Sequence, residues 1–283
     1  MGRVVDTKRI LAALGVAAPP DALLRFIERR LGIAEFERLC AGANVRADNA
    51  DVRGQIADVF AAAGISWEVA GSGASADLSR AGSLVFYANH PYGFADALLA
   101  LSLALARRPD TKVLANGALA GFDFHAAHTI WVDIASGAGR MSTNRRGLRE
   151  AVQHLRGGGA LLIFPSQLCS HLTLPACRVT DPPWSPHLAS LIDLAHAACV
   201  PLYFEGRNSW RFQLMGLIHP AFRTLLLLRE FVRLRGRTIQ VRIGALKPFS
   251  AADAQERPKE RLKRLREGVY ALRDDAAQRM NAG

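Results

Sequence analysis

Cysteine and aromatic residues are both scarce in this sequence. Its 283 residues include four cysteines, none of them in a CxxC pair, and 7% Phe, Trp and Tyr. So few thiols argue against a disulfide framework or a zinc site, and they fit a reducing compartment. No aromatic RNA-stacking motif, zinc-finger spacing or helix-turn-helix is found. We therefore expect no nucleic-acid partner, although nucleic-acid binding remains an alternative function for so basic a chain.

Long hydrophobic runs are also missing. The longest apolar stretch, residues 97–106, is about half the ~20 residues that a transmembrane helix needs. Near the amino terminus, Pro19 and Pro20 interrupt a short apolar patch, which is unlike a signal peptide. We expect a cytoplasmic protein, either free or bound peripherally to the inner face of a membrane.

Positive charge is in excess. Lys and Arg number 36 against 25 Asp and Glu, a formal net charge of +11, while 50% hydrophobic and 22% charged residues are globular values. This balance points to nucleic acid, an anionic membrane surface, or acidic carriers and substrates as partners. Residues 222–235 interleave apolar and basic side chains, which fits either a helix on an anionic membrane or a core helix with a solvated basic face. The basic run 257–266 is typical of a solvated terminal helix, and an acidic carrier protein would be steered to it.

The apolar pattern divides the chain into three parts. We predict a helical segment over residues 1–70, an α/β core over 71–250 and a basic helix over 251–283. In the first part, Asp48 or Asn49 is expected to cap a helix that runs through Val52, Ile56, Val59 and Phe60. The core alternates short apolar runs with helical stretches, which favours a largely parallel sheet flanked by helices. The expected strands are 84–87, 112–114, 129–132, 160–164 and 200–204, and the expected core helices are 94–106, 143–156 and 186–198.

A histidine and a carboxylate flank the turn after the first of these strands. Residues 88–96 read ANHPYGFAD. Functional side chains of parallel sheets lie on loops beyond the carboxyl ends of the strands, so His90 is a candidate general base and Asp96 a candidate to orient it. The same residues would equally serve as a turn cap and a helix cap. The spacing alone leaves both interpretations open.

Two further strand ends carry polar residues. Residues 163–167 read IFPSQ, and residues 203–209 read YFEGRNS. Hydroxyls and backbone N–H groups after a strand bind anions, although an ordinary loop exit has the same composition. Glu205 and Arg207 would also satisfy each other as a simple ion pair. Arg145, in a basic cluster on the expected helix 143–156, is a further candidate for substrate binding.

Together and in this order, these blocks resemble the glycerolphosphate/lysophospholipid acyltransferase superfamily, and within it the hemolysin-like branch. NHPYGFAD at residues 89–96 is similar to that branch's N-H-P-x-G-x-x-[DE] block, and IFP at 163–165 falls where the family has its F-P block. Four later segments also resemble blocks of that branch: DPPW (181–184), FEGRNS (204–209), LRE (228–230) and VRIG (241–244). The resemblance covers about residues 70–250.

The sequence departs from the superfamily pattern at three places. Five residues, instead of four, separate His90 from Asp96, a spacing that the branch shares. The F-P block continues with Ser166-Gln167, where the family has Glu-Gly or Ala-Gly, which puts the binding role of that block in doubt. Phe94 and Ala97 stand where the branch often has glycine, and we expect them to narrow the mouth of the pocket.

The resemblance implies direct transfer of a fatty acyl group from a thioester, on coenzyme A or acyl carrier protein, to a hydroxyl or amine of a lyso-lipid or related acceptor. His90 would deprotonate the acceptor and Asp96 would orient His90, with no metal and no bound cofactor. We expect the acyl chain in an apolar slot between helix 94–106 and residues 220–228. The candidate substrate-binding residues are Asn89, Gly93, Arg145, Phe164, Pro165, Ser166, Gln167, Glu205, Arg207 and Asn208.

Two alternative functions are a non-catalytic binding protein and a hydrolase. A lipid- or carrier-binding protein of the same fold would have lost the chemistry, and the test is whether His90 and Asp96 touch. A hydrolase is disfavoured, because neither G-x-S-x-G nor a P-loop occurs.

Overall fold

A computed structural model describes residues 5–13, 15–45, 51–79, 81–117, 123–132, 140–174 and 177–280. Its strands are β1 (Ser66–Ala70), β2 (Leu84–Ala88), β3 (Lys112–Asn116), β4 (Thr129–Val132), β5 (Ala160–Ile163), β6 (His171–Thr173), β7 (Arg178–Thr180), β8 (Ala198–Phe204) and β9 (Thr238–Ile243). Its helices are α1 (Thr7–Ala13), α2 (Asp21–Arg30), α3 (Ile33–Gly42), α4 (Val52–Ala62), α5 (Ala95–Leu105), the 3-10 helix η2 (Asp123–His128), α6 (Arg140–Arg156), α7 (His187–Ala195), α8 (Trp210–Ile218), α9 (Ala221–Val232), α10 (Ala251–Gln255) and α11 (Pro258–Met280).

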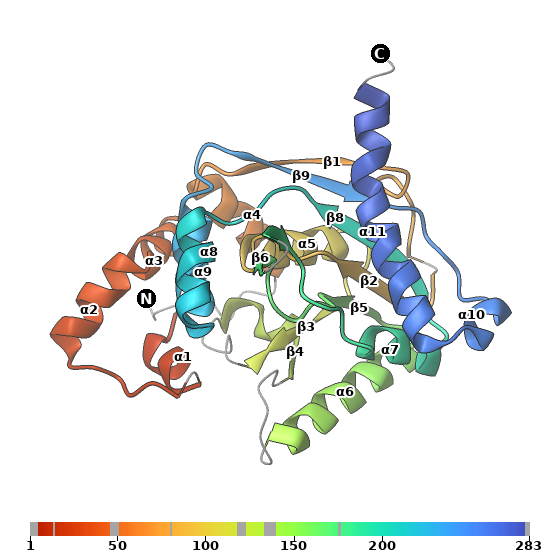
Figure 1. Cartoon of the computed structure of the whole chain (residues 1–283), viewed down its shortest axis with the longest axis horizontal. Coiled ribbons are helices and arrows are strands. Elements are labelled where there is room, and N and C mark those ends of the chain that lie inside the picture. Colours follow the sequence, from red (N-terminus) through yellow and green to blue (C-terminus); the bar gives the residue numbers. More distant parts are fainter. Residues whose placement is uncertain are drawn as a thin grey trace.

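Seven of the described strands form one sheet at the centre of the molecule (Figure 1). The order is β1-β9-β8-β2-β5-β3-β4, and β6 and β7 form a separate hairpin. Neighbouring strands run parallel except β8 and β9, which are antiparallel. The predicted α/β class with a largely parallel sheet is confirmed.

Helices cover both faces of the sheet, because side chains of the central strands alternate between two apolar cores. In β2, Leu84 and Phe86 belong to one core, while Val85 and Tyr87 belong to the other. The first core joins the sheet to α3, α4, α5 and α9, and the second joins it to α6, α7 and α11. Every residue of β2 is buried, as expected of a parallel strand covered on both faces.

An aromatic cluster attaches the amino-terminal helices to the loop after β2. Phe36 of α3 meets Phe94 and Phe231 edge to face, with ring centroids 5.2 and 5.5 Å apart, and Phe60 of α4 meets Phe231 at 5.3 Å. Phe94 immediately precedes α5 and is 4% exposed in this core. The expectation that Phe94 narrows the pocket is therefore wrong, because its ring is buried in this aromatic cluster and does not line the pocket beside His90.

Strand β1 was not expected, since it lies inside the predicted helical segment 1–70. It pairs in parallel with β9 at one edge of the sheet, and its residues are alternately exposed and half-buried. A half-exposed edge strand has no continuous apolar run, so its sequence gives a weak signal. The cap of α4 also differs: Asp51 accepts the N–H of Gly54 at 2.8 Å, while Asp48 and Asn49 lie outside the described residues.

Helix α9 settles the two interpretations of residues 222–235. It buries Leu227, Leu228 and Phe231 against α3 and α8. Its Arg229 donates to the backbone oxygen of Arg30 at 2.6 Å. α9 is therefore a packed core helix, as the second of these interpretations predicts.

Helix α11 is also more closely packed than its charge pattern predicts. Leu265 and Val269 are buried in the second core, and the Arg261 side chain is 2% exposed. Arg261 pairs with Asp193 of α7, so the buried cation has an anionic partner. The solvated terminal helix expected for residues 257–266 is thus wrong for one face. Within the described ranges, no helix combines the length and apolar character needed to span a membrane.

Candidate active site

His90 and Asp96 lie in contact at the carboxyl end of β2. Asp96 is the second residue of α5, where the helix dipole favours a carboxylate. Nδ1 of His90 is 3.1 Å from Oδ1 of Asp96, and the two side chains are 13% and 0% exposed. The atoms are at ion-pair distance, although their alignment falls short of a hydrogen bond, as is common before substrate binds. With Nδ1 turned to Asp96, Nε2 is the ring nitrogen left for a reaction partner.

Asp181 holds the backbone of His90. Its Oδ1 accepts the N–H of His90 at 3.2 Å and the hydroxyl of Ser170 at 2.5 Å, and its Oδ2 accepts the indole N–H of Trp184 at 3.0 Å. The N–H of Ser170 donates to the carbonyl oxygen of His90 at 2.7 Å. The segment from Ser170 to Trp184 is therefore tied to the strand end that carries the histidine. Asp181 was recognised in the sequence only as part of a family block, because none of these contacts is local.

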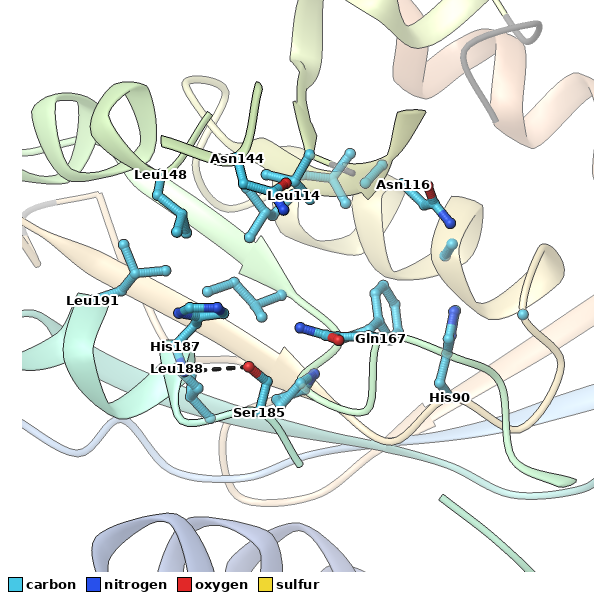
Figure 2. A pocket seen from close by; sticks show the side chains of 18 residues that line it. His90, Leu114, Asn116, Asn144, Leu148, Gln167, Ser185, His187, Leu188 and Leu191 are labelled. Carbon is cyan, nitrogen blue, oxygen red and sulfur yellow. Dashed lines mark hydrogen bonds between the residues drawn. The ribbon is translucent and has the colours of Figure 1, made fainter. Parts of the chain in front are cut away.

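A pocket of ≈ 280 Å³ opens beside His90 (Figure 2). It lies at the carboxyl ends of β3, β4 and β5, where ligands of parallel sheets bind, and α6 and α7 contribute the facing wall. Ala97 of α5 lines the pocket, as expected, but no residue of 220–228 does. The prediction that residues 220–228 flank the acyl slot is therefore wrong for this pocket. Its labelled lining includes the apolar Leu114, Leu148, Leu188 and Leu191 and the polar Asn116, Asn144, Gln167, Ser185 and His187.

The IFPSQ block forms the side of the pocket nearest His90. The ring of Phe164 stacks on the imidazole, with centroids 4.1 Å apart and planes 30° from parallel. Pro165 and Gln167 also line the pocket, whereas Ser166 is buried outside its lining. Gln167 has φ +61°, the left-handed conformation that favours glycine. Gln167 therefore has a glycine-like backbone conformation at the position where the family has glycine. In Figure 2 its side-chain amide lies between His90 and His187.

Residues 49–277 match the family described as Acyltransferase. The chain belongs to this acyltransferase family. The lyso-glycine lipid O-acyltransferase of Phocaeicola vulgatus is 26% identical over 204 residues, covering 69% of this chain and 70% of the relative. The crystal structure of the 1-acyl-sn-glycerophosphate acyltransferase PlsC of Thermotoga maritima aligns with 79% of this chain and 78% of its own, at 16% identity and a TM-score of 0.46. The resemblance inferred from sequence is confirmed at the level of the family.

In this acyltransferase, Asn89 joins two strands. Its Nδ2 donates to the carbonyl oxygen of Phe204, and its Oδ1 accepts the N–H of Phe204, both at 2.8 Å. The side chain is thus used to clamp the end of β2 to the end of β8. A contact of Asn89 with substrate stays a prediction.

No residue of the YFEGRNS segment lines the pocket. Glu205 and Arg207 are exposed, and Asn208 donates to the backbone oxygen of Tyr92 at 3.1 Å. Glu205 approaches Arg242 at 3.9 Å, while the Arg207 guanidinium lies over the ring of Trp210, so the two do not form the simple pair considered above.

Two other candidates remain near the pocket. Gly93 lines it, with φ +81°. Arg145 is exposed on α6 beside Asn144, and Asn144, unlike Arg145, lines the pocket. Asn144, Asn116, Ser185 and His187 were missed in the sequence, because they come from segments whose burial only the fold defines.

Two neighbours of Asp96 are unsuited to acid–base work at neutral pH. Burial, reinforced by the Asp96 carboxylate, raises the pKa of the Tyr92 hydroxyl to about 12. Burial, reinforced by the same carboxylate, raises the pKa of the Cys169 thiol to about 12. Both groups stay protonated near pH 7, so neither supplies a nucleophilic anion. Among the residues that the structure describes, no group of three or more His, Cys, Asp and Glu side chains is arranged to hold a metal ion.

Proposed function

We propose that this acyltransferase moves a fatty acyl group from an acyl thioester to a hydroxyl or amine of a lyso-lipid, with His90 as the general base. The observation that carries the proposal is the 3.1 Å contact between His90 and Asp96 at the edge of the pocket. Asp96, buried at the start of α5, fixes the proton on Nδ1 and stabilises the imidazolium that forms. The lone pair of Nε2 then faces the acceptor.

The chemistry follows from this geometry. As the acceptor oxygen or nitrogen attacks the thioester carbonyl carbon, its proton passes to Nε2 of His90. The tetrahedral intermediate collapses with cleavage of the C–S bond, and the imidazolium returns the proton to the departing thiolate. The products are the acylated acceptor and a free thiol on the carrier, with no covalent acyl-enzyme and no bound cofactor.

Two observations support a lipid acceptor. The relative from Phocaeicola vulgatus is named for O-acylation of a lyso-glycine lipid, which also favours a hydroxyl over an amine. The leucines of the pocket suit an acyl chain, since each buried CH₂ contributes about 0.8 kcal/mol. The net charge of +11 suits coenzyme A or acyl carrier protein as the donor, and a peripheral site on the inner membrane face.

The test is product formation by the purified protein. Acyl-coenzyme A and acyl carrier protein thioesters are each incubated with a panel of lyso-lipids, and products are identified by mass spectrometry. His90→Ala should lower kcat by about 10³-fold, and Asp96→Asn should leave a larger residual rate, because the base survives in a poorer tautomer. His196→Asn, an exposed histidine at the end of α7, is the matched control and should keep full activity. Full activity in His90→Ala would overturn the mechanism, and lyso-lipid binding without any product would identify a non-catalytic lipid-binding protein.

A further inference from the structure

We propose that the exposed face of α8, with four arginines at its amino-terminal end, docks the acyltransferase on an anionic lipid bilayer. The inference rests on the proposed lipid acceptor and names the surface through which the protein reaches it. It also moves the expected membrane contact from α9, which is packed in the core, to the helix before it. Figure 1 shows α8 at the surface, beside α9.

One face of α8 is apolar and exposed. The opposite face is packed in the protein through Phe212, Gln213 and Gly216, all buried. At about 3.6 residues per turn, the four exposed apolar side chains lie within about 100° of the helix circumference. Single exposed apolar residues are ordinary on protein surfaces, but a contiguous apolar face marks an interaction site. The four are Trp210 (56% exposed), Leu214 (57%), Leu217 (43%) and Ile218 (73%).

Arginines surround the amino-terminal end of this face. A second pocket of ≈ 400 Å³ is lined by Arg207, Arg211, Arg233 and Arg237, together with Asn208, Ser209 and Trp210. All four arginines are exposed. The nearby carboxylate of Glu230 accepts both the N–H and the hydroxyl of Ser209 at 2.7 Å and lies 3.8 Å from Arg233. One carboxylate beside four guanidinium groups leaves a net positive site, and guanidinium groups bind phosphate bidentately.

An anionic bilayer matches both halves of this surface. Tryptophan prefers the level of the lipid headgroups, leucine and isoleucine enter the acyl boundary, and arginine binds headgroup phosphates. A neutral partner protein would match the apolar half alone, and an acidic carrier protein would match chiefly the arginine half. The surface is also connected to the active site: Asn208 at its start donates to Tyr92, whose own N–H donates to Asp96 at 2.9 Å. A lyso-lipid would therefore be presented beside the loop that holds the catalytic pair.

Co-sedimentation with vesicles tests the surface. The full chain is mixed with phosphatidylcholine vesicles with or without phosphatidylglycerol. We expect binding to the anionic vesicles that weakens as salt rises. The triple variant Leu214→Gln, Leu217→Gln, Ile218→Gln should lower vesicle affinity by about tenfold or more, and Arg211→Gln with Arg237→Gln should reduce the salt dependence. Matched controls are Leu23→Gln with Phe26→Gln, similarly exposed apolar residues on α2, and Arg257→Gln with Lys259→Gln, exposed basic residues just before and at the start of α11.

Activity separates this inference from the proposed function. The triple variant should acylate a detergent-dispersed lyso-lipid at the wild-type rate and a vesicle-embedded lyso-lipid more slowly. Vesicle binding unchanged in the triple variant, or reduced equally in the α2 control, would overturn the docking surface. Loss of a dimer in the triple variant, with vesicle binding intact, would assign the face to a second copy of the chain and overturn it as well. If wild-type protein binds anionic vesicles through α8 but forms no product in either presentation, the docking surface stands and the proposed function fails.

Discussion

The side-chain amide of Asn89 takes both backbone hydrogen-bonding groups of Phe204. One bond runs from Nδ2 to the carbonyl oxygen and the other from the Phe204 N–H to Oδ1, each 2.8 Å long. Asn89 directly follows β2, and Phe204 is the last residue of the neighbouring parallel strand β8. The pair therefore joins the strand end that carries His90 to the strand end that leads into α8. It links the catalytic loop to the proposed membrane surface.

Loss of this clamp should destabilise the protein. In Asn89→Ala, the backbone N–H and carbonyl of a buried strand end lose their partners, which should cost about 2–4 kcal/mol in the free energy of unfolding. Chemical denaturation measures the difference. Gln240→Ala, which removes an exposed bond to Glu68, is the control and should change stability by less than about 0.5 kcal/mol. Equal effects in the two variants would contradict the clamp.

Gly93 should not tolerate a side chain. It has φ +81°, and a Cβ there would lie 2.6 Å from Cδ2 of Leu227 and 3.1 Å from Cβ of Cys169. Gly82, with φ +63° and nothing within 4 Å of such a Cβ, isolates the backbone cost. Gly82→Ala should lower stability by about 1 kcal/mol, and Gly93→Ala by about 1–3 kcal/mol more, because overpacking adds to the strain. Thermal unfolding of both variants measures the two losses of stability, and kcat is measured for Gly93→Ala. Equal destabilisation of the two variants would show that the protein relieves the close contacts at Gly93.

Asp181 should position His90 without touching the substrate. In Asp181→Asn, an NH₂ group replaces one of the two carboxylate oxygens. This donor then faces N–H or O–H groups that donated hydrogen bonds to the oxygen. The His90 backbone should shift, and kcat should fall by about 10²-fold with KM little changed. Near-UV circular dichroism of Trp184 reports the local rearrangement independently of activity. A fall in stability with kcat unchanged would mean that Asp181 serves the fold alone.

Gln167 should limit what enters the pocket. Gln167→Gly removes a side chain from the pocket and relieves a left-handed conformation that costs about 1 kcal/mol, partly offset by the greater chain entropy of glycine. Unfolding free energy should change by less than about 1 kcal/mol. We expect the variant to accept bulkier acyl chains or acceptors, seen as a changed ratio of kcat/KM across a substrate series. An unchanged ratio would place Gln167 outside the substrate's path.

Thiol labelling should distinguish one cysteine. Burial raises the pKa of the thiols of Cys40, Cys169 and Cys199 to about 12, while Cys177 is exposed. Because only thiolates react rapidly, a disulfide-exchange reagent at pH 8 should label one thiol in the native protein and four after denaturation. Cys177→Ser should abolish the native reaction. More than one fast thiol in the folded protein would mean that the core opens locally.

Local patterns explain which parts of the fold were predicted. The runs at 84–87 and 160–164 are buried on both faces of a parallel sheet, so they are continuously apolar and recognisable alone. β1 and β9 lie towards one edge, with alternate side chains half or fully exposed, and pair across 172 residues of sequence, as Ser66 does with Thr238. No local signal encodes that pairing.

The sequence by itself determined the α/β class, the strand–loop–helix unit that carries His90 and Asp96, and the family, because each depends on residues close together in the chain. The tertiary structure alone decided that Nδ1 and Oδ1 of this pair meet, that Asp181 holds the histidine backbone, and that α6 and α7 complete the pocket. It also decided between two adjacent helices that both contain apolar and basic residues. α9 is buried because α3 and α8 both pack on it, whereas α8 leaves one face with Trp210 and Ile218 exposed. Burial depends on which surfaces meet, and that is a property of the whole fold.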